Sequence, residues 1–241
     1  MDEVIIKVDK LTRKFGKFIA VNEISFEVAK GEIFGFLGAN GAGKTTAIKM
    51  LTGLLSSTSG IASVAGFDIV TASEKIKKSI GYMSQKFSLY EDLTVKENIR
   101  FYGGIYGLSR KQIKVKTAKL LDTLQMHDMA NQMTVDLPLG WKQKLAFSIA
   151  IIHDPKIVFL DEPTSGVDPI ARRQFWEMIY KAAHEGTTVF VTTHYMDEAE
   201  YCDRISIMVD GKIVALDTPS RLKEIHNTPS INDLFIKMAR G

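Results

Sequence analysis

The sequence predicts an α/β protein with a largely parallel sheet. Segments typical of strands and of helices alternate along the chain, which is the pattern of parallel sheets covered by helices. Two strand-like segments, Glu32–Leu37 and Ile157–Leu160, are almost wholly apolar, as expected for strands that are covered on both faces. A stretch between them has helical patterns and no strand. The middle of the chain is therefore predicted to be a helical insertion into the sheet.

Strands come first along the chain. The segments Glu3–Val8 and Ile24–Val28 are rich in apolar residues, and the second alternates between polar and apolar positions. Lys30-Gly31 then predicts a turn into Glu32–Leu37. After a glycine-rich turn, the pattern predicts a helix from about Lys44 to Leu51.

The middle and the last part of the chain differ in pattern. From Thr94 to about Met126 the spacing predicts two helices, interrupted near glycines. A further helix is predicted from residues that share one face: Trp141, Leu145, Ile149 and Ile152. Strands return at Ile157–Leu160 and Thr187–Thr192, and Asp210-Gly211 is typical of a two-residue hairpin turn.

Composition narrows the class of protein. The chain has 241 residues, 45% of them hydrophobic, which is enough for a sizeable core and excludes a disordered chain. It shows no apolar stretch of membrane-spanning length and no secretory signal, and its one cysteine suits a reducing compartment. We therefore expect a soluble, cytoplasmic protein. A formal net charge of +3 is too small to indicate a nucleic-acid partner.

One stretch of the chain is strongly basic, although the net charge of the whole chain is small. The stretch 110–119 holds five basic residues and no acidic one. A contact with nucleic acid or with lipid head groups is one interpretation, and a solvated helix face is the more common one.

A phosphate-binding loop is the strongest functional signal. The stretch Gly38–Thr45 matches the pattern G-x-x-x-x-G-K-[ST] between a predicted strand and a predicted helix. Glycines let backbone N–H groups turn toward phosphate oxygens, and the helix N-terminus adds its positive end. Lys44 would neutralise the β- and γ-phosphates, and the Thr45 hydroxyl would ligate Mg²⁺. The residues predicted to hold the nucleotide are Gly38, Asn40, Gly41, Ala42, Gly43, Lys44, Thr45 and Thr46.

Two carboxylates follow a second apolar strand. Asp161 comes directly after Ile157–Leu160, where phosphate-loop proteins hold Mg²⁺. Glu162 is the next residue, so its side chain points in a different direction from that of Asp161. It is suited to orient or deprotonate a water that attacks the γ-phosphate. The alternative is a solvated acidic turn before Pro163.

These motifs resemble those of the nucleotide-binding subunit of an ABC transporter. The resemblance rests on the run Asp161–Asp168 together with the loop Gly38–Thr45, and it extends over nearly the whole chain. It implies an ABC-type P-loop ATPase fold: a mostly parallel core, an N-terminal antiparallel β subdomain and a helical subdomain. The implied division of the single domain 1–241 places the core and β subdomain at about 1–85 and 155–241, and the helical subdomain at about 86–154.

The resemblance also assigns roles to single residues. It implies that Phe15 stacks on adenine and that Gln85 touches Mg²⁺ and senses a membrane partner. It implies that Asp168 lies at a dimer interface and that His194 contacts the γ-phosphate. Taken singly, each has a simpler interpretation. Phe15 would be a core residue, Gln85 a solvated loop residue, His194 a histidine bound to backbone, and Asp168 a helix N-cap before Pro169.

The family's signature sequence Leu-Ser-Gly-Gly-Gln is altered here. The matching stretch is Leu137-Pro138-Leu139-Gly140-Trp141, in which Pro138 offers neither a hydroxyl nor an N–H. Gly140 is kept, and we expect the helix behind it to point its N-terminus at the partner's nucleotide. Two interpretations remain: a working variant, as in efflux-type branches, or a weakened ATPase site.

The implied function is ATP hydrolysis in a head-to-tail dimer that drives export. The cofactors are ATP and Mg²⁺, and the partners are a second ATPase subunit, most simply an identical one, and a separate integral membrane permease. The chain would sit on the cytoplasmic face of the cell membrane through that permease. The form of Thr164–Pro169 resembles exporters of the ABC-2 type, including drug-efflux systems. The transported substrate is not encoded in these motifs.

Three other functions fit the sequence less well than this one. A soluble ABC ATPase acting on ribosomes or DNA usually has two ATPase units joined by a charged linker, a long coiled coil or zinc cysteines. None of these features is found in this sequence. A GTPase switch would carry an Asn-Lys-x-Asp motif, which is absent from the sequence. A non-hydrolysing nucleotide-binding module is disfavoured by Glu162 and His194, although Pro138 keeps it open.

Overall fold

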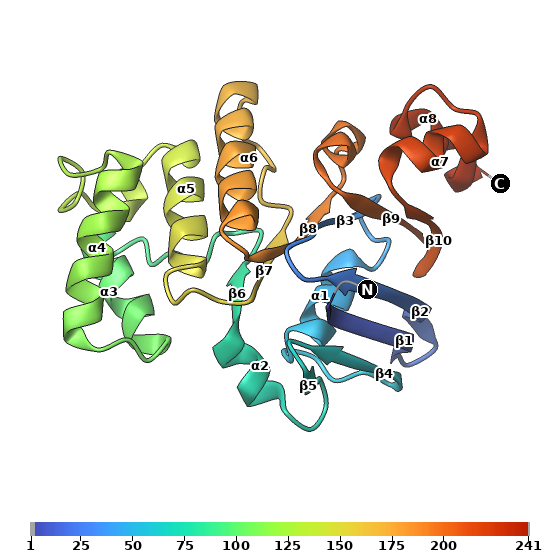
Figure 1. Ribbon diagram of the computed structural model, residues 1–241, viewed down its shortest axis with the longest axis horizontal. Helices are drawn as coiled ribbons and strands as arrows, with labels where there is room; N and C mark the ends of the chain where they lie inside the picture. The colour runs from blue at the N-terminus through green and yellow to red at the C-terminus, as the bar shows by residue number, and fades with distance from the viewer. Residues whose placement is uncertain (1–2, 241) are drawn as a thin grey trace.

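The structure is a computed structural model that describes residues 3–240. Two β-sheets form the centre of the molecule, with helices around them (Figure 1). Helices from the middle of the chain lie together at one end, far from the C-terminal helices at the other (Figure 1). None of the helices within residues 3–240 is both long and apolar enough to cross a lipid bilayer.

The smaller sheet is antiparallel and comes from the first part of the chain. Its strand order is β2-β1-β4-β5. The strands are Val4–Phe15 (β1), Phe18–Ala29 (β2), Ser59–Val64 (β4) and Phe67–Asp68 (β5). The N-terminal antiparallel subdomain is thus confirmed. The strands expected at Glu3–Val8 and Ile24–Val28 are parts of the longer β1 and β2.

The larger sheet has the order β10-β9-β3-β8-β7-β6 and is parallel except for the β9–β10 hairpin. Its strands are Ile33–Gly38 (β3), Ile80–Met83 (β6), Ile157–Asp161 (β7), Thr188–Thr193 (β8), Arg204–Val209 (β9) and Lys212–Asp217 (β10). The hairpin turn at Asp210-Gly211 is confirmed, and both residues have positive φ, as a tight turn of this kind requires.

The larger sheet is buried on both faces. Phe34 and Phe36 of β3 pack into the core shared with the smaller sheet and with α1. Ile33 and Leu37 of the same strand face a second core beneath the helices of the opposite face. This two-sided burial explains why the β3 sequence is an unbroken apolar run.

The helices are Lys44–Leu51 (α1), Ser73–Ser79 (α2), Val95–Ile105 (α3), Arg110–Leu124 (α4), Leu139–Ala150 (α5), Pro169–His184 (α6), Pro219–His226 (α7) and Ile231–Arg240 (α8). Two short 3₁₀ turns lie at Thr134–Asp136 (η1) and Met196–Tyr201 (η2). The helix expected at Lys44–Leu51 has those bounds. The helix expected at Trp141–Ile152 begins earlier, at Leu139, and ends before Ile152.

The helices α3, α4 and α5 form the unit at one end of the molecule (Figure 1). They lie in the chain between β6 and β7, which are neighbours in the sheet. Capping boxes at Thr94 and Ser109 define the starts of α3 and α4. A separate apolar core, which includes Ile99, Leu121 and Leu145, joins the three helices. This placement supports a division near residues 86 and 154, and the boundaries themselves stay a prediction.

Candidate active site

The glycine-rich loop joins β3 to α1 and follows a path that only glycine allows at two points. A Cβ on Gly38 would lie 2.6 Å from the carbonyl oxygen of Met208. Gly43 has φ +107°, and a Cβ there would lie 2.3 Å from the carbonyl oxygen of Ala20. Strands β2 and β9 therefore press on the loop from two sides and fix its curl.

The loop presents backbone donors to its open side. Helix α1 has no side-chain cap, so its first turn is not satisfied locally. Within residues 3–240, the amides of Lys44, Thr45 and Thr46 donate no hydrogen bond. Free amides at a helix N-terminus form an anion site, because the N–H groups and the helix dipole both favour negative charge.

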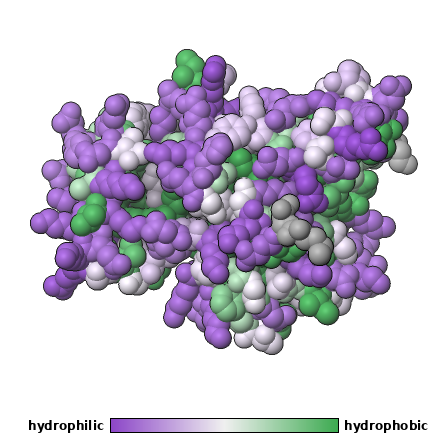
Figure 2. Space-filling view, in the orientation of Figure 1, coloured by the Kyte–Doolittle hydropathy of each residue, from purple (hydrophilic) through white to green (hydrophobic). Residues whose placement is uncertain are grey.

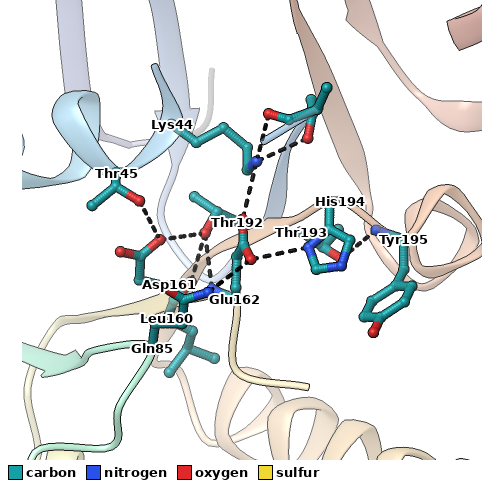
Figure 3. Close-up of polar contacts among 12 residues, drawn as sticks. Lys44, Thr45, Gln85, Leu160, Asp161, Glu162, Thr192, Thr193, His194 and Tyr195 are labelled. Carbon is teal, nitrogen blue, oxygen red and sulfur yellow. Dashed lines mark hydrogen bonds and ion pairs between the residues drawn. The ribbon is translucent and has the colours of Figure 1, made fainter. Parts of the chain in front are cut away.

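Lys44 is buried beneath this loop. Its ammonium donates to the carbonyl oxygens of Gly38, at 2.8 Å, and of Ala39, at 3.1 Å. It also lies 3.1 Å from Oε1 of Glu162, and both side chains are more than nine-tenths buried (Figure 3). The positive charge of Lys44 is thus held next to the loop amides and is paired with the carboxylate of Glu162, the residue that follows β7.

Asp161 is the last residue of β7 and connects two hydroxyl groups. Its Oδ1 accepts hydrogen bonds from Thr192, at 2.8 Å, and from Thr45, at 3.2 Å (Figure 3). Burial raises the pKa of Asp161, while the hydrogen bonds from Thr192 and Thr45 lower it and the nearby Glu162 raises it further. The net direction is upward, so a buried negative charge here costs the fold stability at neutral pH.

We expect Asp161→Asn to stabilise the protein and to abolish its response to Mg²⁺ with ATP. The amide removes a buried charge while its oxygen still accepts from both hydroxyls, so the melting temperature should rise by about 2–4 °C. Because the folded pKa is raised, this advantage is full at neutral pH. It shrinks as pH falls through the folded pKa and is lost well below about 4, the ordinary pKa of aspartate, where Asp161 is protonated in both the folded and the unfolded state.

Differential scanning calorimetry from pH 7 downward measures this difference. Wild-type protein should melt at a higher temperature when Mg²⁺ and ATP are added, whereas Asp161→Asn should show no added effect of Mg²⁺. Asp128→Asn is the matched control, because Asp128 is an exposed residue of the turn that follows α4. An Asp161→Asn protein that melts below wild type at pH 7 would contradict the interpretation.

Glu162 is the centre of a buried polar network. Its backbone has φ +49°, a conformation that costs a non-glycine residue about 1–3 kcal/mol. Its amide donates to the hydroxyl of Thr192, at 3.0 Å, which holds this turn. The turn directs the Glu162 side chain away from that of Asp161, so the two neighbouring carboxylates have different partners (Figure 3). Their interpretation as a solvated turn is wrong, because both are buried.

Gln85 and His194 both contact Glu162 from the segments that follow β6 and β8. The Gln85 amide donates to Oε2 of Glu162 at 3.2 Å. Nδ1 of His194 lies 3.0 Å from the same oxygen. Because a carboxylate oxygen only accepts, this contact assigns a proton to Nδ1 of His194, and Nε2 remains available to a ligand. His194 is thus held by a side chain and not by backbone, and Gln85 is exposed but not free of contacts.

Thr192 is a site residue that no sequence motif predicts. It lies near the end of β8, fully buried, and its hydroxyl contacts Asp161 as well as the Glu162 amide. The only sequence signal is a threonine in an apolar strand two positions before His194. Strand pairing explains its role, since Asp161 and Thr192 are partners in the parallel β7–β8 register.

The remaining predicted site residues lie around this centre. Phe15 is 47% exposed at the β1–β2 hairpin, with the Arg13 guanidinium 4.5 Å from its ring centroid, so its interpretation as a core residue is wrong. Asp168 caps α6, accepting from the amides of Ile170 and Ala171 at 3.0 Å each. Its role as an N-cap before Pro169 is confirmed. Gln143, on α5, donates to the carbonyl of Pro163 and joins that helix to the turn after Glu162.

The altered signature stretch forms the start of α5. Pro138 is the N-cap without a side-chain bond, and Leu139 and Gly140 are the first two helical residues. Within residues 3–240 their two amides donate no hydrogen bond, whereas the Trp141 amide bonds to the Pro138 carbonyl at 2.9 Å. Leu139 is 45% exposed. The helix start therefore offers two free amides at the surface.

The site can hold a phosphate chain and a small divalent cation. Within residues 3–240, no three His, Cys, Asp or Glu side chains lie together as a metal cluster. Mg²⁺ needs no such cluster, because it usually takes one or two protein oxygens together with phosphate oxygens and water. Thr45 and Asp161 bring two such oxygens within 3.2 Å of each other at the edge of the loop. The residues thus fit a nucleotide with Mg²⁺.

Comparisons with known proteins agree with this geometry. A family model described as "ABC transporter" matches residues 21–165. The chain is 47% identical, over 241 residues, to the "Probable multidrug ABC transporter ATP-binding protein YbhF" of Escherichia coli K12; the match covers 98% of this chain and 42% of that relative. It is 36% identical to the "Linearmycin resistance ATP-binding protein LnrL" of Bacillus subtilis 168, covering 90% of this chain and 70% of the relative. The chain thus spans less than half the length of the first relative.

A solved structure shows the same fold. The "Structure of ATP binding subunit of ABC transporter" superposes with a TM-score of 0.87 at 27% sequence identity. The match covers 97% of this chain and 98% of that one. Both sheets and the helical unit therefore have counterparts in a protein with that title.

Proposed function

This chain belongs to the ABC transporter family and has the ABC ATPase fold, and from this premise we propose that it hydrolyses ATP, with Mg²⁺, to drive export through a separate membrane permease. The observation that carries the proposal is the position of Glu162. Its carboxylate contacts Lys44, Gln85 and His194 at 3.0–3.2 Å, directly beside the loop amides.

ATP binding follows from the loop. The free amides at the start of α1 would bind the β- and γ-phosphate oxygens, and Lys44 would neutralise them. To do so, Lys44 must exchange Glu162 for a phosphate oxygen. That exchange releases Oε1 of Glu162 when the nucleotide enters. Phe15, exposed on the adjoining hairpin, is available to stack on the adenine ring.

Hydrolysis uses the released carboxylate. Glu162 would accept a proton from a water molecule while the oxygen of that water attacks the γ-phosphorus. The bond between the γ-phosphorus and the bridging oxygen of the β-phosphate would break, and ADP would leave. Nε2 of His194 and the Gln85 amide would position that water and the γ-phosphate. Mg²⁺, held by Thr45 and Asp161, supplies positive charge to the phosphate oxygens. Gln85 would be a further ligand of this ion.

The γ-phosphate also needs positive charge on its far side, which one chain does not supply. We propose that a second copy presents the start of its α5, with Gly140, to that side. Backbone amides of Leu139 and Gly140 would replace the hydroxyl that Pro138 lacks. Asp168, next to this surface on α6, would lie at the same interface. The free amides favour a working variant of the signature over a weakened site.

Leu139→Asp tests the dimer. The fold should tolerate a carboxylate at this position because Leu139 is exposed. A negative charge in the first turn of a helix is also stabilised by the positive end of the helix dipole. In the dimer it would face the partner's γ-phosphate, so we expect turnover to fall by about tenfold or more. Wild-type turnover per chain should rise with protein concentration, as measured by phosphate release and light scattering with ATP.

Leu139→Asn is the matched control, because it has the same shape as the aspartate without the charge. It should retain turnover within a few fold of wild type. Equal activities of the two variants, or wild-type turnover that is independent of protein concentration, would contradict the head-to-tail dimer.

The partners and place in the cell rest on the relatives. YbhF and LnrL are named as ATP-binding proteins of a probable multidrug transporter and of linearmycin resistance. We propose that this chain likewise serves an ABC-2 type efflux system and binds the cytoplasmic face of a permease in the cell membrane. Two identical chains would fill the two ATPase positions, and no nucleic acid is expected as a partner.

A further inference from the structure

A second charged groove lies in the helical unit, away from the nucleotide site. It runs between α3 and α4 and encloses about 640 Å³. Four basic residues line it: Lys96 and Arg100 from α3, and Arg110 and Lys114 from α4. Ile113, Ala118 and Leu121 provide an apolar surface within the same groove. The two helices approach closely here, because a Cβ on Gly103 would lie 2.9 Å from the Ile113 side chain.

The basic side chains of this groove make no direct ion pair with a carboxylate of the described residues, although Arg100 acts on Glu97 at longer range. Within residues 3–240, none of the four basic side chains forms an ion pair. The neighbouring carboxylates are engaged elsewhere: Glu97 caps α3 at Thr94, and Asp122 contacts His127 at the end of the groove. The α4 N-terminus, next to Arg110, adds the positive end of a helix dipole. The local field therefore favours an anion.

A buried hydroxyl gives a second indication. Thr117 lines the groove and is only 6% exposed, yet its hydroxyl has no hydrogen-bond partner among residues 3–240. A helical threonine usually bonds to a carbonyl of the preceding turn, and buried polar groups are nearly always paired. An oxygen-rich ligand in the groove would satisfy it.

We propose that this groove binds the head group of an anionic phospholipid at the membrane surface. The four cations would surround the phosphate, and the apolar surface would accept the less polar part of the lipid. A free phosphate would leave that apolar surface uncovered. Single-stranded nucleic acid usually stacks its bases on aromatic rings, and no Phe, Tyr or Trp lines the groove. In the view of Figure 2 the surface over α3 and α4 is mainly hydrophilic, as expected for a face that binds head groups and does not insert.

The test is sedimentation of the purified chain with vesicles at constant ionic strength. Wild type should bind vesicles of equal parts phosphatidylcholine and phosphatidylglycerol and should ignore pure phosphatidylcholine. Arg100→Gln with Lys114→Gln should weaken binding about thirtyfold, since each basic residue near an anionic surface contributes about fivefold. Both residues are exposed and glutamine is a good helix former, so the fold should be kept.

The matched control is Lys111→Gln with Lys119→Gln. It removes the same charge from exposed positions of α4 that do not line the groove. The affinity of this double variant for the anionic vesicles should fall by no more than a few fold. Thr117→Val, which removes only the hydroxyl, should weaken vesicle binding severalfold without lowering the melting temperature, because no bond is lost.

Three results would overturn the proposal. An equal loss in the two double variants would mean a diffuse positive surface. Displacement by millimolar inorganic phosphate, or equally tight binding of an RNA oligonucleotide, would identify a different ligand. ATP binding, measured on the same samples, should be unchanged in every variant, so the outcome is independent of the nucleotide site.

Discussion

Glu162→Gln is expected to lower ATP turnover by about 10²-fold or more while ATP binding is retained. Glutamine has the shape of glutamate but does not accept a proton from water. It also removes the carboxylate that holds Lys44 at 3.1 Å, so Lys44 no longer has to leave a negative partner when phosphate arrives. Affinity for ATP should therefore be equal to wild type or severalfold higher. With hydrolysis blocked, ATP should trap the dimer, which light scattering detects.

Glu177→Gln is the matched control for this variant. Glu177 lies on the exposed side of α6, 3.8 Å from Arg173, and has no contact with the loop. It should hydrolyse ATP at the wild-type rate. If Glu162→Gln also kept wild-type turnover, Glu162 would not be the general base and the proposed mechanism would be wrong.

Lys44→Ala is expected to weaken ATP binding by at least about 10²-fold. Hydrogen bonds to charged groups contribute about 1.5–3 kcal/mol each, and this ammonium is the only cation that the structure places among the described residues of the loop. The substitution also leaves Glu162 buried with Gln85 and His194 as its remaining partners. A lower melting temperature should accompany the loss of binding. Calorimetric titration with ATP and circular dichroism measure the two effects.

Lys49→Ala provides the comparison on the same helix. Lys49 lies in the last turn of α1 and is exposed. Its replacement by alanine therefore removes one positive charge without changing the loop. ATP affinity of Lys49→Ala should match wild type. A folded Lys44→Ala protein that bound ATP with wild-type affinity would show that the loop amides suffice without the ammonium.

Local sequence was enough to predict several elements of the fold. The helix Lys44–Leu51 was predicted with its bounds, because a glycine turn before it and an apolar face within it are signals contained in a few residues. A strand at Ile157–Leu160 was predicted from its apolar run, and β7 extends it by one residue to Asp161. The turn at Asp210-Gly211 was predicted from its dipeptide. Each of these signals acts between near neighbours in the chain.

Other elements have no such local signal. The short strands β4 and β6 were not predicted, because they pair with strands far away in the chain. The strand β5 was not predicted either, because its two residues are too few for a period-two pattern. The start of α5 was placed at Trp141 from its apolar face. The structure begins that helix at Leu139, where Pro138 supplies a suitable backbone conformation and not a side-chain cap.

The amino-acid sequence by itself determined the chemical groups of this protein: glycines where a loop must curl, one lysine, two adjacent carboxylates, a glutamine and a histidine. Only the tertiary structure decided which of them meet. Parallel pairing of β7 with β8 brings Thr192 onto Asp161, and the left-handed turn at Glu162 directs its carboxylate to Lys44, Gln85 and His194. These contacts join segments that are distant in the chain, and their burial at the ends of β7 and β8 holds them together. Their energies depend on that packing, which no single stretch of sequence contains.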